Sequence, residues 1–241
     1  MEKIVSLKEK GLNPSQISKL TNIPRGTVRD VCKKYADVAQ LAEARVSKTR
    51  CYRFESCGQH YAYVLGLYLG DGYICKSRST YRLRIYLDKK YPSIISETVQ
   101  RLGYIFPEQK IGIGDNDGFV NVGVYANHLP EVFPQHGPGR KHNRTIKLKR
   151  WQKKILKENP RDFLRGLIHS DGCKDLNHVN GKEYPRYSFS NRSLEIIEIF
   201  LWACNLLGIS ATTSIREHKS SSVYIATRKN VQFMDTFIGN K

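Results

Sequence analysis

The sequence predicts an α+β protein whose larger part consists of two similar halves, each in the order helix, strand, strand, helix, strand, strand, helix. A small all-helical unit precedes them. Two near copies of one segment indicate the halves: VLGLYLGDG at 64–72 and LRGLIHSDG at 164–172, whose aspartates lie 100 residues apart (171 − 71). Alternating apolar and polar residues after each copy indicate the strands and are typical of half-buried antiparallel sheets.

The helical unit is predicted at residues 1–35, with one helix near 15–20, a turn, and a last helix at 24–34. Val28 and Val31 recur at i and i+3, so they face inward. The residues left on the outer side are Arg25, Thr27 and Arg29. The unit resembles a helix-turn-helix whose outer residues contact DNA, although short helix pairs also occur in bundles that bind no nucleic acid.

The two halves are predicted at 61–135 and 160–241, with a connecting segment at 36–60 and a basic linker at 136–159. The first half is expected to contain helices at 61–70, 92–102 and 126–133, and strands at 73–77, 81–88, 110–114 and 119–125. The second half is expected to contain helices at 160–170, 193–207 and 228–237, and strands at 173–177, 184–190, 211–217 and 221–226.

The strand at 81–88 shows most clearly that the two sheet faces differ. Its inward residues are apolar and its outward residues are basic or aromatic, so one face packs and the other carries charge. The inward set is Leu83, Ile85 and Leu87, and the outward set is Arg82, Arg84 and Tyr86. The same alternation places Val120, Val122 and Val124 on an inner face in the first half, and Tyr187 and Phe189 in the second.

Each repeated segment is predicted to form an apolar helix with small residues four positions apart. These are Gly66 and Gly70 in the first copy, and Gly166 and Ser170 in the second. Residues at this spacing share one helix face, so two such helices can touch backbone to backbone. The spacing also occurs in ordinary helix contacts. The presence of two copies, and not either copy alone, therefore indicates a paired functional site.

Both predicted helices stop at an Asp-Gly pair. An aspartate in the last turn lies beside free carbonyl groups and partial negative charge, which costs about 0.3–1 kcal/mol. A carboxylate next to such carbonyls is a site for a hard cation. Parallel packing of the two helices would therefore let Asp71 and Asp171 hold divalent metal, Mg²⁺ or Mn²⁺, together.

The charge balance favours a polyanionic partner. The chain has 40 Lys and Arg against 22 Asp and Glu, a formal net charge of +18. Nucleic acid is the leading candidate for this partner, and a ribosome-associated or membrane-surface protein is the alternative. The six cysteines show no metal-finger spacing, and no apolar run reaches transmembrane length, so we expect reduced thiols and an intracellular protein, cytoplasmic or nucleoid-associated.

Two segments concentrate this positive charge. Residues 76–90 include Arg78 and five further basic residues against a single aspartate. The segment from Arg140 to Lys157 has nine Lys or Arg and no acidic residue. Both are predicted to contact phosphates, which favours binding at low salt because neutralised phosphates release counterions.

The two Asp-Gly helices, the doubled order of elements, and the segments PGRK at 138–141 and FSNRSL at 189–194 together resemble the LAGLIDADG homing endonucleases. The resemblance covers roughly residues 61–238 and leaves out the helical unit. It implies a single-chain, two-motif protein in which the motif helices form the central interface and the antiparallel sheets form a saddle over DNA. The implied activity is double-strand cleavage of a long asymmetric DNA site by a monomer.

The resemblance also implies particular residues. Asp71 and Asp171 would be catalytic and bind metal, with the backbone carbonyls of Gly70 and Ser170 as further ligands. The residues expected to contact DNA in this part are Arg78, Arg82, Arg84, Arg140, Lys141, Arg186, Arg216 and Lys219. The basic residue that assists catalysis in the family is not placed by the pattern, and Lys76 and Lys174 are the nearest basic residues after each motif.

Two other functions fit the same residues. A DNA-binding transcriptional regulator that has lost cleavage is consistent with the added helical unit, although both aspartates are retained. An intron maturase could use the same basic saddle to bind RNA. A metabolic enzyme is disfavoured because the sequence has no phosphate-loop or dinucleotide-binding fingerprint.

Overall fold

The computed structural model describes residues 4, 6–7, 11–32, 54–216, 219–239 and 241. The chain divides into two compact units, Met1–Arg53 and Phe54–Lys241, which are described separately. No helix in these described ranges has the length and apolarity needed to span a membrane.

The first unit contains α2 (Pro14–Thr21) and a helix over 25–32, joined by a three-residue turn. The side chain of Asn13 accepts hydrogen bonds from the backbone N–H groups of Ser15 and Gln16, which fixes the start of α2. Asn22 ends α2 in the left-handed conformation. The small core consists of Ile4, Ile17, Val28 and Cys32, with Val31 partly buried against it.

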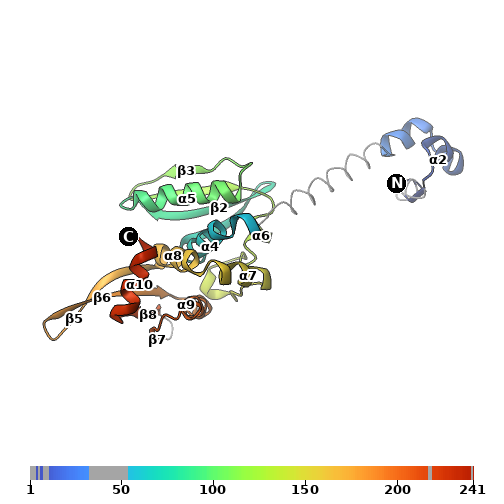
Figure 1. Ribbon diagram of the computed structural model, residues 1–241. Coiled ribbons are helices and arrows are strands. Elements are labelled where there is room, and N and C mark those ends of the chain that lie inside the picture. Colours follow the sequence, from blue (N-terminus) through green and yellow to red (C-terminus); the bar gives the residue numbers. More distant parts are fainter. Residues whose placement is uncertain (1–3, 5, 8–10, 33–53, 217–218, 240) are drawn as a thin grey trace. The chain divides into compact units, whose positions relative to one another are not determined.

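The second unit contains two four-stranded antiparallel sheets with the same strand order, and the paired helices α4 and α8 lie between them (Figure 1). The first sheet is ordered β1 (Gly72–Ser77), β2 (Thr80–Asp88), β4 (Phe119–Tyr125) and β3 (Gly112–Asp115). The second is ordered β5 (Gly172–Val179), β6 (Lys182–Asn191), β8 (Ser221–Ile225) and β7 (Thr212–Ser214). The helices are α4 (Phe54–Asp71), α5 (Pro92–Ile105), α6 (Leu129–Val132), α7 (Arg150–Glu158), α8 (Pro160–Asp171), α9 (Leu194–Leu206) and α10 (Arg228–Ile238). The predicted α+β architecture of two similar halves is confirmed.

The inner faces of the sheets are those that the alternation predicted. The β2 residues Leu83, Ile85 and Leu87 and the β4 residues Val120, Val122 and Val124 are buried. In the second sheet Tyr187 and Phe189 are buried, and Phe189 stacks on Phe200 of α9 with ring centroids 4.3 Å apart. The opposite face of each sheet carries polar and charged side chains together with exposed aromatic ones, such as Tyr125 in the first sheet and Tyr184 in the second.

The backbones of α4 and α8 touch at the small residues. A Cβ atom at Gly166 would lie 2.1 Å from the Tyr63 carbonyl oxygen, and one at Gly66 would lie 2.7 Å from the Phe163 carbonyl oxygen. Neither position accepts a side chain without moving the helices apart. This contact sets the two Asp-Gly ends against each other.

The linker predictions were wrong in extent. Helix α4 begins at Phe54, inside the segment predicted at 36–60, whose residues 36–53 lie outside the described ranges. The predicted linker at 136–159 contains the 3-10 turn η1 (Lys141–Asn143) and α7. Helix α7 buries Gln152, Ile155 and Leu156 at positions i, i+3 and i+4, a pattern that its four basic residues and glutamate concealed.

Other boundaries also differ from the predictions. Strand β7 ends at Ser214, so Arg216 follows the strand instead of lying within it. Strands β5 and β6 run longer than expected and meet in a tight turn at Asn180 and Gly181, both with positive φ. Helix α6 is limited to Leu129–Val132.

Candidate active site

The two motif aspartates lie together at the paired ends of α4 and α8. A Cβ atom at Gly70 would lie 2.4 Å from the Ser170 hydroxyl oxygen and 2.9 Å from a carboxylate oxygen of Asp171. Burial and the neighbouring Asp171 charge raise the pKa of Asp71 to about 6. Burial also raises the pKa of Asp171. Two partly buried carboxylates whose charges repel each other favour a cation between or beside them.

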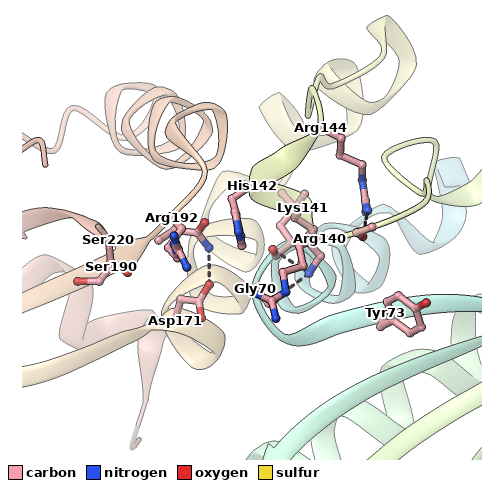
Figure 2. A pocket seen from close by; sticks show the side chains of 13 residues that line it. Gly70, Tyr73, Arg140, Lys141, His142, Arg144, Asp171, Ser190, Arg192 and Ser220 are labelled. Carbon is pink, nitrogen blue, oxygen red and sulfur yellow. Dashed lines mark hydrogen bonds between the residues drawn. The ribbon is translucent and has the colours of Figure 1, made fainter. Parts of the chain in front are cut away.

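Two cavities open beside this pair of carboxylates, and each combines parts of both motifs. The first cavity, of about 580 Å³, is lined by Asp171 from α8 and by Gly70, the residue before the other aspartate. Figure 2 shows these two residues facing the same space. The second cavity, of about 300 Å³, is lined by Asp71 from α4 and by Ser170. Each cavity therefore offers one carboxylate together with the helix end of the opposite motif.

A lysine ammonium group lies at each helix end. Lys141 Nζ donates hydrogen bonds to the carbonyl oxygens of Tyr68, Leu69 and Gly70, the last at 2.7 Å. The positive charge compensates the partial negative charge of the carbonyls at the end of α4. Lys141 lines the first cavity, close to Gly70 (Figure 2).

Lys241 occupies the equivalent position in the second half. Its Nζ donates to the carbonyl oxygens of Ile168, Ser170 and Gly172, at 2.9, 2.6 and 2.6 Å, and it lines the second cavity. Each lysine follows its motif aspartate by 70 residues (141 − 71 and 241 − 171), a signal in the sequence that the prediction missed. Lys141 was predicted to contact DNA; in the structure its ammonium group donates to carbonyl oxygens at the end of α4.

Both lysines are less basic than an exposed lysine. Burial lowers the pKa of Lys141 to about 8, against the opposing effect of the nearby carboxylates. Burial also lowers the pKa of Lys241. Lys76 and Lys174, the basic residues nearest to each motif in sequence, do not line either cavity. The Lys174 ammonium pairs with Asp235 at 2.6 Å, and Lys76 is exposed on β1.

Asn191 fixes the orientation of the second carboxylate. Its side-chain amide donates to Asp171 Oδ2 at 2.6 Å, and this hydrogen bond lowers the pKa of Asp171 against the larger effect of burial. The Asn191 side-chain oxygen accepts from the backbone N–H of Ser193 at 2.8 Å, which holds the amide in place. The FSNRSL segment at 189–194, part of the resemblance described above, thus contributes Asn191 to the site.

The donor set fits a hard divalent cation. The described residues contain no cluster of three or more His, Cys, Asp or Glu side chains that could hold a metal. Backbone carbonyl oxygens at the ends of α4 and α8 complete the set, because carboxylate and carbonyl oxygens are the ligands that Mg²⁺ prefers.

The predicted DNA-contact residues fall into separate groups. Arg82 and Arg84 lie on the polar face of the first sheet, where Arg82 is 5.0 Å from the centre of the Tyr125 ring. Arg186 lies on the polar face of the second sheet but pairs with Asp175 at 3.0 Å, so much of its charge is already compensated. The exposed loop residues are Arg78, Arg140, Arg216 and Lys219, and those exposed in the first unit are Arg25, Thr27 and Arg29.

Comparison with known proteins identifies the fold of this part of the chain. Residues 158–239, which include α8 to α10, match the model of a LAGLIDADG-like domain. The predicted resemblance is thereby confirmed, and the two halves have the LAGLIDADG fold.

Among solved structures, the chain is similar to the homing endonuclease I-DmoI. Mesophilic variants of I-DmoI match with a TM-score of 0.54 at 20% identity over 75% of this chain and 90% of theirs. The complex of I-DmoI with DNA and Mn matches with a TM-score of 0.55 at 20% identity over 77% of this chain and 99% of that one. The N-terminal LAGLIDADG domain of DUF199/WhiA matches with a TM-score of 0.51 at 14% identity over 79% and 86%. A search of curated proteins found no match.

Proposed function

We propose that this protein is a metal-dependent DNA endonuclease of the homing type, which cleaves both strands of a long asymmetric duplex site. The observation that carries the proposal is the meeting of Asp71 and Asp171 at two paired helix ends, each facing a cavity that the other motif completes. Two equivalent sites in one chain fit two phosphodiester bonds in one duplex. A single copy therefore suffices, and we expect a monomer.

Four groups of this chain would hold the metal, Mg²⁺ or Mn²⁺. They are the carboxylates of Asp71 and Asp171 and the backbone carbonyl oxygens of Gly70 and Ser170, and a metal at either carbonyl would displace the lysine ammonium that donates to it. When bound, a divalent cation withdraws charge from phosphoryl oxygens and makes coordinated water more acidic. I-DmoI variants and complexes have been crystallised with DNA in the presence of Mg, Mn or Ca, which supports a divalent cation as the cofactor proposed for this chain.

The two buried lysines fill the role of the basic residue that the sequence pattern left open. Their ammonium groups lie at the same cavities as the carboxylates and can stabilise negative charge that develops on a phosphate. Because the pKa of Lys141 is about 8, this lysine can also accept or release a proton near neutral pH. Asn191 keeps the Asp171 carboxylate turned toward the first cavity.

The polar faces of the sheets supply the DNA-binding surface in this proposal. Arg82 and Arg84 of the first sheet can reach base edges, with arginine to guanine the most common specific pairing. The remaining residues proposed for phosphate or groove contacts are Arg78, Arg140, Arg186, Arg216 and Lys219. The net charge of +18 supports a nucleic-acid partner, and protein of this charge binds more weakly as salt rises.

The first unit is proposed as a second DNA contact. Its two helices, the three-residue turn and the exposed side chains of Arg25, Thr27 and Arg29 on the second helix match the layout of a helix-turn-helix. Deletion of residues 1–35 should then shorten the DNase footprint while metal-dependent cleavage persists. An unchanged footprint would show that this unit does not read DNA.

A second candidate function, a regulator that binds DNA without cutting it, is favoured by the same added unit. The two functions separate in one assay. Wild-type protein should cut an unoccupied genomic insertion site in Mg²⁺, and Asp71→Asn or Asp171→Asn should abolish cutting while DNA binding in Ca²⁺ is retained. Asp117→Asn, at an exposed turn, is the matched control and should cut normally. Binding by the wild type with no cutting on any target would favour the regulator.

A further inference from the structure

The two motifs differ at the position two residues before the aspartate, which is Leu69 in the first half and His169 in the second. Leu69 is fully buried, so the fold accepts an apolar side chain at this point of a motif helix. His169 is also buried, with 3% of its surface exposed. A buried imidazole at a position that leucine can fill indicates a task for its two ring nitrogens.

Both nitrogens of His169 are hydrogen-bonded to other helices. Nε2 lies 2.9 Å from the carbonyl oxygen of Ile238, and Nδ1 lies 2.8 Å from the hydroxyl oxygen of Tyr63. A carbonyl can only accept, so Nε2 carries the proton and Nδ1 accepts from the tyrosine. The pKa of His169 is lowered to about 4, mainly by burial, which keeps this neutral form in place.

The bond to Ile238 lies at the point where the chain leaves α10. Ile238 is the last residue of that helix, so its carbonyl has no partner within the helix. Gly239 follows with φ of +75°, and a Cβ atom there would lie 3.6 Å from the guanidinium of Arg165 in α8. Lys241, two residues further on, then reaches the three carbonyl oxygens at the end of α8.

The first half uses a different residue for the equivalent task. Lys141 is carried by the segment 135–144, and Arg144 holds that segment by donating to the carbonyl oxygens of Gly137 at 2.9 Å, Gly139 at 2.6 Å and Gln135 at 3.2 Å. Arg144 therefore holds the segment that carries Lys141. His169 contacts the end of α10, which precedes Lys241.

We propose that His169 is a positioning residue: by binding the Ile238 carbonyl it fixes the end of α10 and so places the Lys241 ammonium in the second cavity. The role of Lys241 in cleavage rests on the proposed function, but its placement by His169 does not. Arg144 provides an internal comparison, because its loss should affect Lys141 and leave Lys241 in place.

The first experiment measures lysine reactivity in metal-free protein without DNA. Competitive labelling with acetic anhydride, read by mass spectrometry, should show Lys241 acetylated about fivefold faster in His169→Leu, the change expected when one net hydrogen bond is lost. Lys141 should react at its wild-type rate. His169→Gln, which retains a donor near the Nε2 position, should restore slow labelling of Lys241. Unchanged Lys241 labelling in His169→Leu, or equal acceleration at both lysines, would overturn the proposal.

The second experiment separates the two cavities during cleavage. On a duplex labelled on both strands, His169→Leu should slow nicking of one strand, and Arg144→Met should slow nicking of the other. The double variant His169→Leu/Lys241→Met should be no slower than Lys241→Met alone, because both changes act through one group. Equal slowing of both strands by His169→Leu would mean a general structural effect and would refute the positioning role. Absence of cleavage by the wild type would count against the proposed function, while the labelling result would still decide the role of His169.

Discussion

Replacement of Gly166 by alanine tests the helix contact on which the site depends. The added Cβ would lie 2.1 Å from the Tyr63 carbonyl oxygen and 3.2 Å from the Gly66 Cα, where ordinary contact begins near 3.4 Å. The helices must therefore separate by about 1 Å (3.4 − 2.1 = 1.3), and overpacking of this kind costs about 1–3 kcal/mol. For a unit of this size each kcal/mol lowers the melting temperature by about 2–4 °C.

The assay is thermal and urea unfolding of the full chain, with Gly103→Ala as the matched control. Gly103 lies within α5, and a Cβ there would meet no atom within 4 Å. Alanine at 103 should stabilise the helix by about 0.5–1 kcal/mol, because glycine loses more backbone freedom on folding. The opposite signs of the two substitutions are the prediction. A Gly166→Ala protein that is as stable as Gly103→Ala would refute the close contact between α4 and α8.

Three further predictions concern Asp71 and Asn191 at the site and Arg82 on the first sheet. Because the pKa of Asp71 is raised to about 6, native protein binds more protons than the unfolded chain between about pH 4 and 6, so metal-free protein should lose stability as pH rises through this window. In urea unfolding at several pH values, Asp71→Asn should remove most of that loss, and an identical slope in both proteins would contradict the assignment. Asn191→Ala removes the 2.6 Å bond to Asp171, so single-turnover cleavage should slow by about 10–100-fold with DNA affinity unchanged, and a wild-type rate would mean that the bond does not orient the carboxylate. Arg82→Gln should weaken specific DNA binding by about 1–3 kcal/mol and relax the base preference at one position of the target, whereas an unchanged preference in binding to a set of single-base target variants would place Arg82 away from the base edges.

The features that the sequence predicted well are those set by local pattern. The inner faces of β2 and β4 follow from strict alternation, since neighbouring residues of a strand point to opposite sides. The contact at Gly66 and Gly166 follows from small residues on one helix face. The encounter of Asp71 and Asp171 could be expected from the repeat, because two similar helices that pack in parallel bring equivalent ends together.

The features that the sequence did not predict depend on segments that return from far along the chain. Lys141 and Lys241 lie in unrelated local contexts, and only their equal spacing from the aspartates connects them. The compensation of Arg186 by Asp175 depends on the register of β5 against β6, where the two residues are directly opposite. Helix α7 was not predicted because basic residues cover its outer face and its row of buried residues is short.

The central claim is that the ends of α4 and α8 bind one set of divalent cations jointly. Fe²⁺ with ascorbate and peroxide, added to purified protein, produces radicals that cut the backbone near the bound ion, and the fragments can be mapped by mass spectrometry. We expect cuts at both residues 70–72 and residues 170–172, suppressed by excess Mg²⁺, weakened at both places in Asp71→Asn because one of the two cavities loses its carboxylate, and lost in Asp71→Asn/Asp171→Asn. Cuts at only one helix end, or unchanged cutting in the double variant, would contradict metal binding shared by the two helices.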